Sequence, residues 1–178
     1  MTGKKMKLCA FAASNSKQSI NKALVTYACS LLSEAEAQIL DINDYEMPIF
    51  SVDREQESGQ PQLAHDFLAR IAEADALVVS YAEHNGSYSA AFKNIFDWCS
   101  RIEKQVWQGK PMVLLSTSPG SRGGATVLEL AQTSASYFDG KVKATLAVPN
   151  FHENFDLEKG VMSNEALAQE LKQVMGSL

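Results

Sequence analysis

Short, nearly continuous apolar runs recur along this chain and alternate with segments whose apolar residues recur every three or four positions. The continuous runs predict strands buried on both faces, at residues 8–12, 77–81 and 112–116. Two further segments, 38–42 and 142–148, are interrupted by polar residues or alternate with them, which is typical of edge strands. Helical spacing follows each strand, at residues 20–31, 64–71, 92–99, 127–135 and 167–174.

Strand and helix thus alternate five times, which predicts an α/β fold with a doubly wound, five-stranded parallel sheet and helices on both faces. Because the first, third and fourth strands are the buried ones, we expect the flavodoxin-like order 2-1-3-4-5. In that order the loops after strands one and three are neighbours. The 178 residues, 46% of them hydrophobic, fit a single domain over residues 1–178.

Two connections, residues 43–61 and 149–162, are longer than the sheet needs, and loops of this length usually bind a ligand, contact another subunit or are disordered. The first holds Tyr45, Met47, Pro48, Ile49 and Phe50. We expect this apolar half to pack against the rest of the chain.

Charge and cysteine content exclude several classes of function. A formal net charge of -5 lacks the basic footprint that a nucleic-acid partner requires. Cys9, Cys29 and Cys99 are far apart and read as core residues of a cytoplasmic protein in a reducing compartment. The apolar run at residues 8–13 is far too short for a membrane span and is expected to be the first strand.

Two common kinds of catalytic site are also disfavoured. His65 and His152 have no Cys or His at ligand spacing, so we expect no metal site. A G-x-S-x-G sequence is absent, which argues against a serine hydrolase.

The first strand is followed by S-N-S-K-Q-S-I-N, residues 14–21. Hydroxyls of Ser14, Ser16 and Ser19, the amide of Asn21 and the N–H groups at the start of the next helix could surround a phosphate. The alternative is that Ser19 only caps that helix. Neither G-x-x-x-x-G-K-(S/T) nor G-x-G-x-x-G is present, so the expected group is a monophosphate.

Two other loops sit at comparable junctions of strand and helix, where wound α/β proteins bind small ligands. The polar stretch that begins at Glu83 follows the third strand and leads into an amphipathic helix. Residues 116–124, S-T-S-P-G-S-R-G-G, follow the fourth strand, and their backbone could approach a flat ligand closely. Taken alone, the Pro-Gly pair in this loop could equally be a tight turn.

Together the three loops resemble the NADPH-dependent FMN reductase family of flavodoxin-like flavoproteins, which includes quinone, azo-dye and chromate reductases. That family has G-S-x-R-x-x-S-x-N after strand one, T-P-E-Y-N-(G/Y)-S-(I/Y)-P-G-x-L-K-N-x-x-D-W after strand three and S-P-G-x-x-G-G after strand four. The resemblance covers residues 7 to about 171. It implies that FMN contacts the matching positions, which are Ser14, Ser16, Ser19, Asn21, Ala82, Glu83, His84, Asn85, Ser118, Pro119, Gly120 and Gly123.

Three of these positions depart from the family pattern. Ser16 stands where arginine is usual, Ala82 replaces proline and His84 replaces tyrosine. A charge-assisted hydrogen bond to a phosphate is worth roughly 1.5 to 3 kcal/mol, so its loss weakens FMN binding unless another group compensates. We hypothesise that Lys17 compensates.

The resemblance implies an FMN-dependent NAD(P)H oxidoreductase that passes two electrons to a small-molecule acceptor, namely a quinone, an azo compound, a flavin or a metal oxyanion. No catalytic acid or base is assigned, because the cofactor carries the chemistry. Two alternatives are a single-electron carrier with the same fold, and a binding protein that has lost FMN.

A homodimer or homotetramer is also implied by the family. The helix that begins near Phe92 has an apolar arc wider than contact with a sheet requires, and a second subunit could cover part of it. A crowded neighbouring helix of the same chain is the alternative. On the same helix Lys93, Asp97 and Arg101 lie at four-residue spacing and predict a row of ion pairs.

Overall fold

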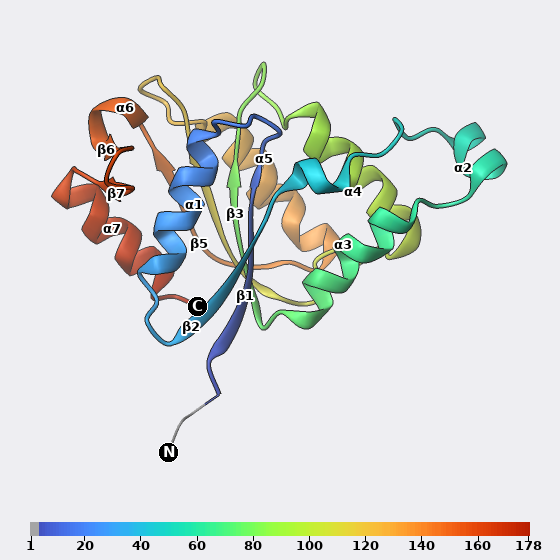
Figure 1. Cartoon of the computed structure of the whole chain (residues 1–178), viewed down its shortest axis with the longest axis horizontal. Helices are drawn as coiled ribbons and strands as arrows, with labels where there is room; N and C mark the ends of the chain where they lie inside the picture. Colours follow the sequence, from blue (N-terminus) through green and yellow to red (C-terminus); the bar gives the residue numbers. More distant parts are fainter. Residues whose placement is uncertain (1–3) are drawn as a thin grey trace.

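The computed structural model describes residues 4–178 and contains one five-stranded parallel sheet (Figure 1). Its order, β2-β1-β3-β4-β5, is the predicted one. The strands are β1 (Met6–Ala13), β2 (Ala35–Leu40), β3 (Ala76–Tyr81), β4 (Pro111–Thr117) and β5 (Lys141–Val148).

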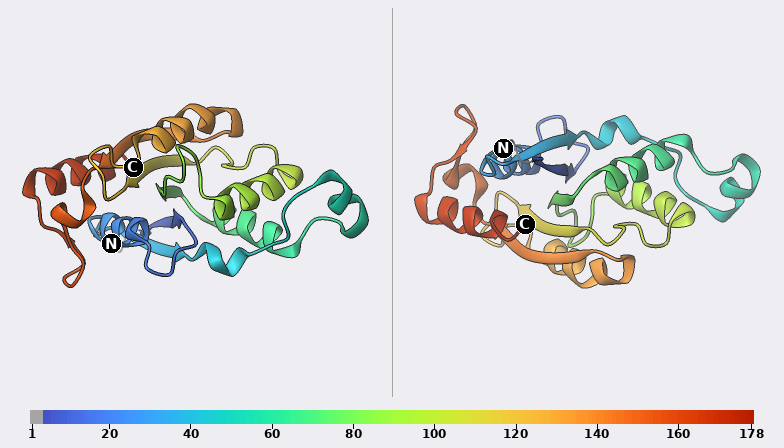
Figure 2. Two further views of the ribbon diagram at one scale, coloured as in Figure 1. Left: turned by 90° about the horizontal axis from the view of Figure 1, so that it is seen from above. Right: turned by 90° about the horizontal axis from the view of Figure 1, so that it is seen from below.

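Helices cover both faces of the sheet, as two views along its plane show (Figure 2). One face carries α1 (Ile20–Ser30) and α7 (Glu165–Met175), and the other carries α3 (Gln62–Glu73), α4 (Ala90–Ile102) and α5 (Ala125–Ala135). Successive residues of the central strands enter opposite cores. Ala10 and Val113 pack toward α1 and α7, whereas Phe11 and Leu114 pack toward the other three helices.

The second strand begins and ends earlier than predicted. It covers Ala35–Leu40 rather than residues 38–42, and its last partner in β1 is Phe11. Asp41 stops the strand because its carboxylate accepts a hydrogen bond from Asn43 N (3.0 Å), which caps the 3-10 helix η1 (Ile42–Tyr45). The polar residue that suggested an edge strand therefore ends that strand.

The long connection after β2 contains η1 and a short helix, α2 (Val52–Ser58). Residues 46–61, here called the arm, project beyond α4 (Figure 1). The arm is held by α4, because Asn94 accepts a hydrogen bond from Phe50 N (2.9 Å) and donates to Met47 O (3.0 Å). Trp98 Nε1 also donates to Pro48 O at 2.7 Å.

Packing of the apolar half of this connection is confirmed for most of its residues. Tyr45 and Met47 are buried, and the Phe50 ring lies 5.0 Å from that of Trp98 in an edge-on arrangement. The exceptions are Pro48, which is exposed, and Ile49, with 67% of its surface exposed. The arm thus covers part of the apolar arc of α4 from within the chain.

The connection after β5 forms α6 (Phe151–Asn154) and an antiparallel hairpin of β6 (Phe155–Asp156) and β7 (Val161–Met162). Phe155 is buried and meets Tyr27 of α1 edge-on at 5.9 Å. The hairpin therefore extends the core on the α1 and α7 face.

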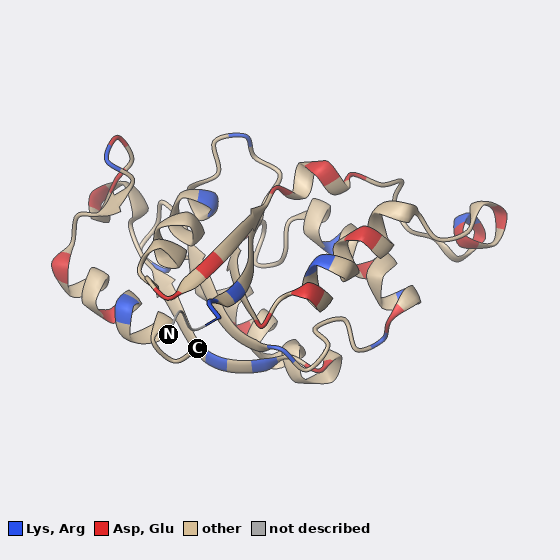
Figure 3. Cartoon of the chain, turned by 60° about the horizontal axis from the view of Figure 1, so that its bottom comes forward, with Lys and Arg blue, Asp and Glu red and all other residues tan. Residues whose placement is uncertain are grey.

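Charged residues of both signs are interspersed over the elements (Figure 3). Lys93 pairs with Asp97 at 2.6 Å, as predicted, but Arg101 pairs with Glu55 of the arm at 2.9 Å instead of continuing the row on α4. Within residues 4–178, no helix is long and apolar enough to cross a bilayer.

The loops that follow the strands lie at one edge of the sheet, and the start of β1 and the end of α7 lie at the other. All five strands run the same way, so their carboxyl ends meet at one edge. The amino end of β1 and the carboxyl end of α7 lie at the opposite edge (Figure 1).

Candidate functional site

A hollow of about 210 Å³ lies where β1, β3 and β4 end. Three loops border it, each leading from one of these strands into α1, α4 or α5. Nine of the predicted site residues line it, namely Ser14, Ser16, Ser19, Asn21, Ala82, Glu83, His84, Ser118 and Pro119. The structure therefore brings these nine residues together, as predicted. That they bind FMN remains a prediction.

The loop after β1 presents hydroxyl groups whose oxygens already accept hydrogen bonds from the backbone. Ser14 Oγ accepts from Ser16 N at 3.2 Å, and Ser19 Oγ accepts from Lys22 N at 3.2 Å and so caps α1. Their O–H hydrogens can still be donated. Together with the unpaired N–H groups of a first helical turn, they form a donor set that suits a phosphate.

Asn21 has a structural task that the sequence did not reveal. Its side chain is buried, and Oδ1 accepts hydrogen bonds from Ser80 Oγ (2.8 Å) and Thr117 N (3.1 Å). Its Nδ2 donates to Thr117 O at 3.3 Å. Asn21 therefore ties the first turn of α1 to the ends of β3 and β4, directly beneath the hollow.

The loop after β3 is a tight hairpin. His84 and Ser87 exchange two backbone hydrogen bonds, at 2.9 and 3.1 Å, around Asn85 and Gly86. Both central residues have positive φ, 52° and 74°, which is the signature of an Asn-Gly type I′ turn. Asn85 therefore lies at the exposed tip outside the hollow, and His84 is exposed beside it.

The loop after β4 needs its glycines for backbone geometry. A Cβ on Gly123 would lie 2.7 Å from the carbonyl carbon and oxygen of Val148, and the residue has a φ of +59°. Ser116 Oγ donates to Gly123 O at 2.7 Å, and this bond attaches the loop to the end of β4. Gly123 is therefore required by the shape of the loop, whereas a Cβ on Gly120 would meet only Ser118 Oγ at 3.9 Å, and neither glycine lines the hollow.

Sequence patterns missed several residues around this edge. Gln18, Ile20 and Thr117 also line the hollow. A second hollow of about 210 Å³ lies beyond the β1 loop. It is lined by Asn15, by Tyr45 of η1, by Met47 of the arm and by the start of α4. The unusual length of residues 43–61 was the one signal that pointed to it.

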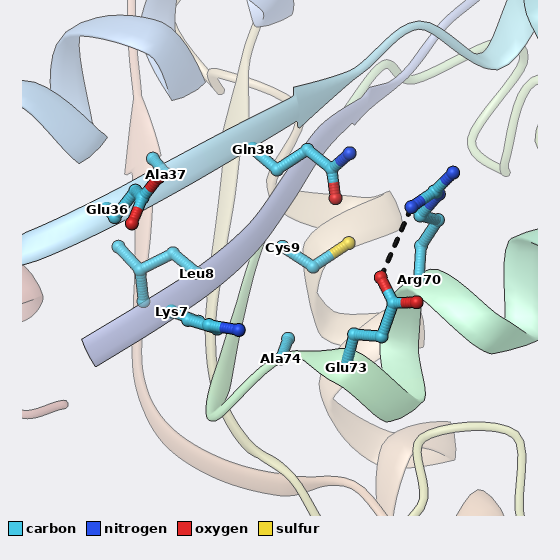
Figure 4. A pocket seen from close by; sticks show the side chains of 9 residues that line it. All are labelled: Lys7, Leu8, Cys9, Glu36, Ala37, Gln38, Arg70, Glu73 and Ala74. Carbon is cyan, nitrogen blue, oxygen red and sulfur yellow. Dashed lines mark hydrogen bonds and ion pairs between the residues drawn. The ribbon is translucent and has the colours of Figure 1, made fainter. Parts of the chain in front are cut away.

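A larger groove, of about 510 Å³, lies elsewhere, between β1, β2 and α3 (Figure 4). Cys9 is its floor, and Arg70 and Glu73, paired at 3.2 Å, form one side. None of the predicted site residues lines this groove. Its charged residues have mixed signs, so it does not select an anionic cofactor.

Comparison with known proteins agrees with the resemblance seen in the loops. The family described as NADPH-dependent FMN reductase matches residues 6–153. An NADPH:quinone oxidoreductase from Arabidopsis thaliana is 31% identical over 180 residues, which cover 97% of this chain and 90% of the plant protein. A 2-hydroxy-1,4-benzoquinone reductase from Burkholderia sp. is 33% identical over 136 residues, covering 75% of this chain and 72% of the relative.

A solved structure shows the same fold. FerB, a flavoenzyme NAD(P)H:(acceptor) oxidoreductase from Paracoccus denitrificans, superposes with a TM-score of 0.80. The alignment covers 97% of this chain and 94% of FerB at 24% identity. The likeness at this level concerns the fold.

Proposed function

This chain belongs to the NADPH-dependent FMN reductase family, and from that premise we propose that it uses FMN, bound at the hollow, to reduce a quinone with electrons from NADPH or NADH. Membership makes it an enzyme and implies FMN and NAD(P)H as cofactors. Quinone stands first among the acceptors because two relatives are quinone reductases. An azo compound, a free flavin or a metal oxyanion are the other acceptors to be tested.

The observation that carries the proposal is the donor set of the β1 loop. Ser14 and Ser19 accept hydrogen bonds from the backbone and keep their O–H hydrogens for a ligand, beside the N-terminus of α1. Such a set fits the phosphate of FMN without an arginine. Ser16 lines the same side of the hollow, and Lys17, which is exposed in this loop outside the lining, would supply the positive charge.

The remaining loops fit a flat ring. Ala82 to His84 form one wall and Ser118 and Pro119 the other. The bound flavin would supply the hydride and electron chemistry, so the chain has only to orient the ring and leave one face open. Backbone N–H groups of residues 118–124, where they meet the ring, would stabilise negative charge on it.

A homodimer or homotetramer is the assembly that we propose. A hollow of about 220 Å³ between α4 and α5 is lined by Phe92, Phe96, Trp107 and Phe138. Leu130 beside it is 40% exposed. Light scattering after gel filtration should give at least twice the chain mass of 19.4 kDa, and Leu130→Lys should reduce it to one chain mass.

We place the protein in the cytoplasm, on the evidence of its three cysteines. All three are free and buried, which suits a reducing compartment. Fluorescent fusion and fractionation would test this location.

The main test is spectroscopic. The purified protein should show bound-flavin absorption, lose it on anaerobic mixing with NADPH and regain it when 1,4-benzoquinone is added. Titration with an azo dye, FMN or chromate in place of the quinone ranks the acceptors. A colourless protein that cannot be reconstituted with FMN would refute the proposal.

A further inference from the structure

Helix α5 begins without a cap of its own. Its N-cap residue is Gly124, whose φ is 76° and which has no side chain to accept a hydrogen bond from the first turn. The missing acceptor comes from another loop, because Glu83 Oε2 accepts from Val127 N at 2.8 Å. A carboxylate at this end of a helix is also favoured by the helix dipole.

This bond joins the loop after β3 to the start of the helix that follows the loop after β4. Glu83 comes two residues after β3, and Val127 lies in the first turn of α5. The hairpin tip lies near the same turn, since a Cβ added to Gly86 would come 3.9 Å from Thr126 Cγ2. The loop after β3 is therefore bonded to the first turn of α5 through Glu83 and has its tip close to that turn.

Each loop is otherwise held to a different part of the sheet. Ser89 Oγ, just after the hairpin, donates to Ala13 O of β1 at 2.9 Å. On the other side, Gly120 O accepts from Asn150 N at 2.9 Å, which ties that loop to the end of β5. The bond of Glu83 to Val127 connects the loop after β3 to the first turn of α5, into which the separately anchored loop after β4 leads.

We propose that Glu83 is a positioning residue, which caps α5 from the opposite loop and thereby sets the separation of the two walls of the hollow. Its effect on a flavin rests on the proposed function, but the cap itself does not. With a carboxylate committed to α5, Glu83 acts on a bound ring through the placement of both loops and through its negative charge, which opposes electron uptake nearby.

Three variants separate these effects, and all are measured first without cofactor. Glu83→Ala removes the acceptor, Glu83→Gln keeps an oxygen acceptor but no charge, and Glu129→Ala is the control, because Glu129 is an exposed acid on the same helix. Hydrogen exchange of the Val127 amide, followed by NMR in the apoprotein, should accelerate about tenfold or more in Glu83→Ala. It should stay within about threefold of wild type in Glu83→Gln and in the control.

The flavin-loaded proteins supply the second readout. Glu83→Ala should raise the Kd for FMN about tenfold, whereas Glu83→Gln should bind near wild-type affinity. The midpoint potential of bound FMN should be more positive in Glu83→Gln than in wild type, which loss of a purely structural cap would not produce.

Failure of this inference can be told apart from failure of the proposed function. An unchanged Val127 exchange rate in Glu83→Ala, or an unchanged potential together with unchanged affinity in the loaded variants, overturns the inference. If wild type binds no FMN, the proposed function fails while the apoprotein exchange still tests the cap. If Glu83→Ala does not fold, Glu83→Gln decides through the midpoint potential of bound FMN, and an unchanged potential in that variant overturns the inference.

Discussion

The side-chain oxygen of Asn21 accepts a hydrogen bond from Thr117 N at 3.1 Å, across 96 positions of sequence. It joins the start of α1 to the last residue of β4, in the floor of the candidate site. A buried polar group that loses such a partner retains its full desolvation cost.

Asn21→Ala should therefore lower the free energy of unfolding by about 2 to 3 kcal/mol. Urea denaturation of the apoprotein, followed by circular dichroism, measures this change. Gln18→Ala, an exposed change in the same loop, should stay within about 0.5 kcal/mol of wild type. Equal stabilities of the two variants would contradict the role assigned to Asn21.

Gly123→Ala should destabilise the chain more than Gly160→Ala does. Both glycines have positive φ, +59° and +67°, but only at Gly123 would the new Cβ meet backbone, at 2.7 Å from Val148. Gly160→Ala is expected to cost about 1 to 2 kcal/mol and Gly123→Ala about 2 to 5 kcal/mol. The same pair should differ in FMN affinity, because only Gly123 shapes the site.

Calorimetric melting of both variants gives the comparison directly. Similar melting temperatures for the two would show that the loop after β4 moves away from Val148 at little cost. The short distance to Val148 would then not explain why position 123 is a glycine.

Lys17→Ala should weaken FMN binding about two- to fivefold, since Lys17 is exposed and solvent screens its charge. The salt dependence of the affinity should also become shallower, because a charge contact with the phosphate has been removed. Fluorescence titration at several salt concentrations measures both. Lys104→Ala, with the same charge change after α4, is the control, and an unchanged affinity and salt slope in Lys17→Ala would exclude Lys17.

The cysteines should be unreactive in the native protein. Burial raises the pKa of Cys9, Cys29 and Cys99 from near 9 to about 12, so their thiolates are scarce at pH 8. Ellman's reagent should label no thiol in the native apoprotein and all three in urea. A thiol that reacts at once in buffer would contradict this burial.

The same shift predicts a loss of stability in alkali. Above pH 9 the unfolded thiols lose protons that the folded ones retain, which favours unfolding. Stability from this source is complete below pH 9 and falls as the pH rises from 9 toward 12. Replacing Cys99 with Ala should flatten part of that decline in alkaline urea titrations.

Asn94→Ala should release the arm while the sheet remains folded. Asn94 accepts from Phe50 N and donates to Met47 O, so the substitution removes these two polar attachments of the arm to α4, while the bond from Trp98 to Pro48 and the pair of Arg101 with Glu55 remain. Trypsin should cut at Arg54 several times faster, as mass spectrometry of early fragments would show. Lys93→Ala is the neighbouring control, and equal cutting rates would show that Trp98 and Phe50 suffice to hold the arm.

Much of the fold could be predicted from the chain because its signals are local. Continuous apolar runs located β1, β3 and β4, and the order of the sheet followed from which strands were buried. The predicted end of β2 was wrong because Asp41 caps a turn, which depends on the side chain's choice of partner.

The candidate site also divides into features that local sequence predicts and contacts between distant segments that it does not. Loops at the strand ends could be placed from sequence, since parallel strands bring their carboxyl ends together. The bond of Glu83 to Val127 and that of Arg101 to Glu55 join distant segments, and no spacing rule reveals such pairs. The Asn85-Gly86 turn, by contrast, has a local sequence signal, but it was not among our predictions.

The end of α7 and the candidate site lie at opposite edges of the sheet, and this arrangement has a practical consequence. A tether joined at the carboxyl end of α7 would leave the hollow directed away from the support, because the loops that border the hollow lie at the opposite edge of the sheet from that helix end (Figure 1). Attachment to an electrode in this orientation would keep the loops open to diffusing reactants. The direction of the strands thus suits this chain to surface-bound electrochemistry without rearrangement of its sequence.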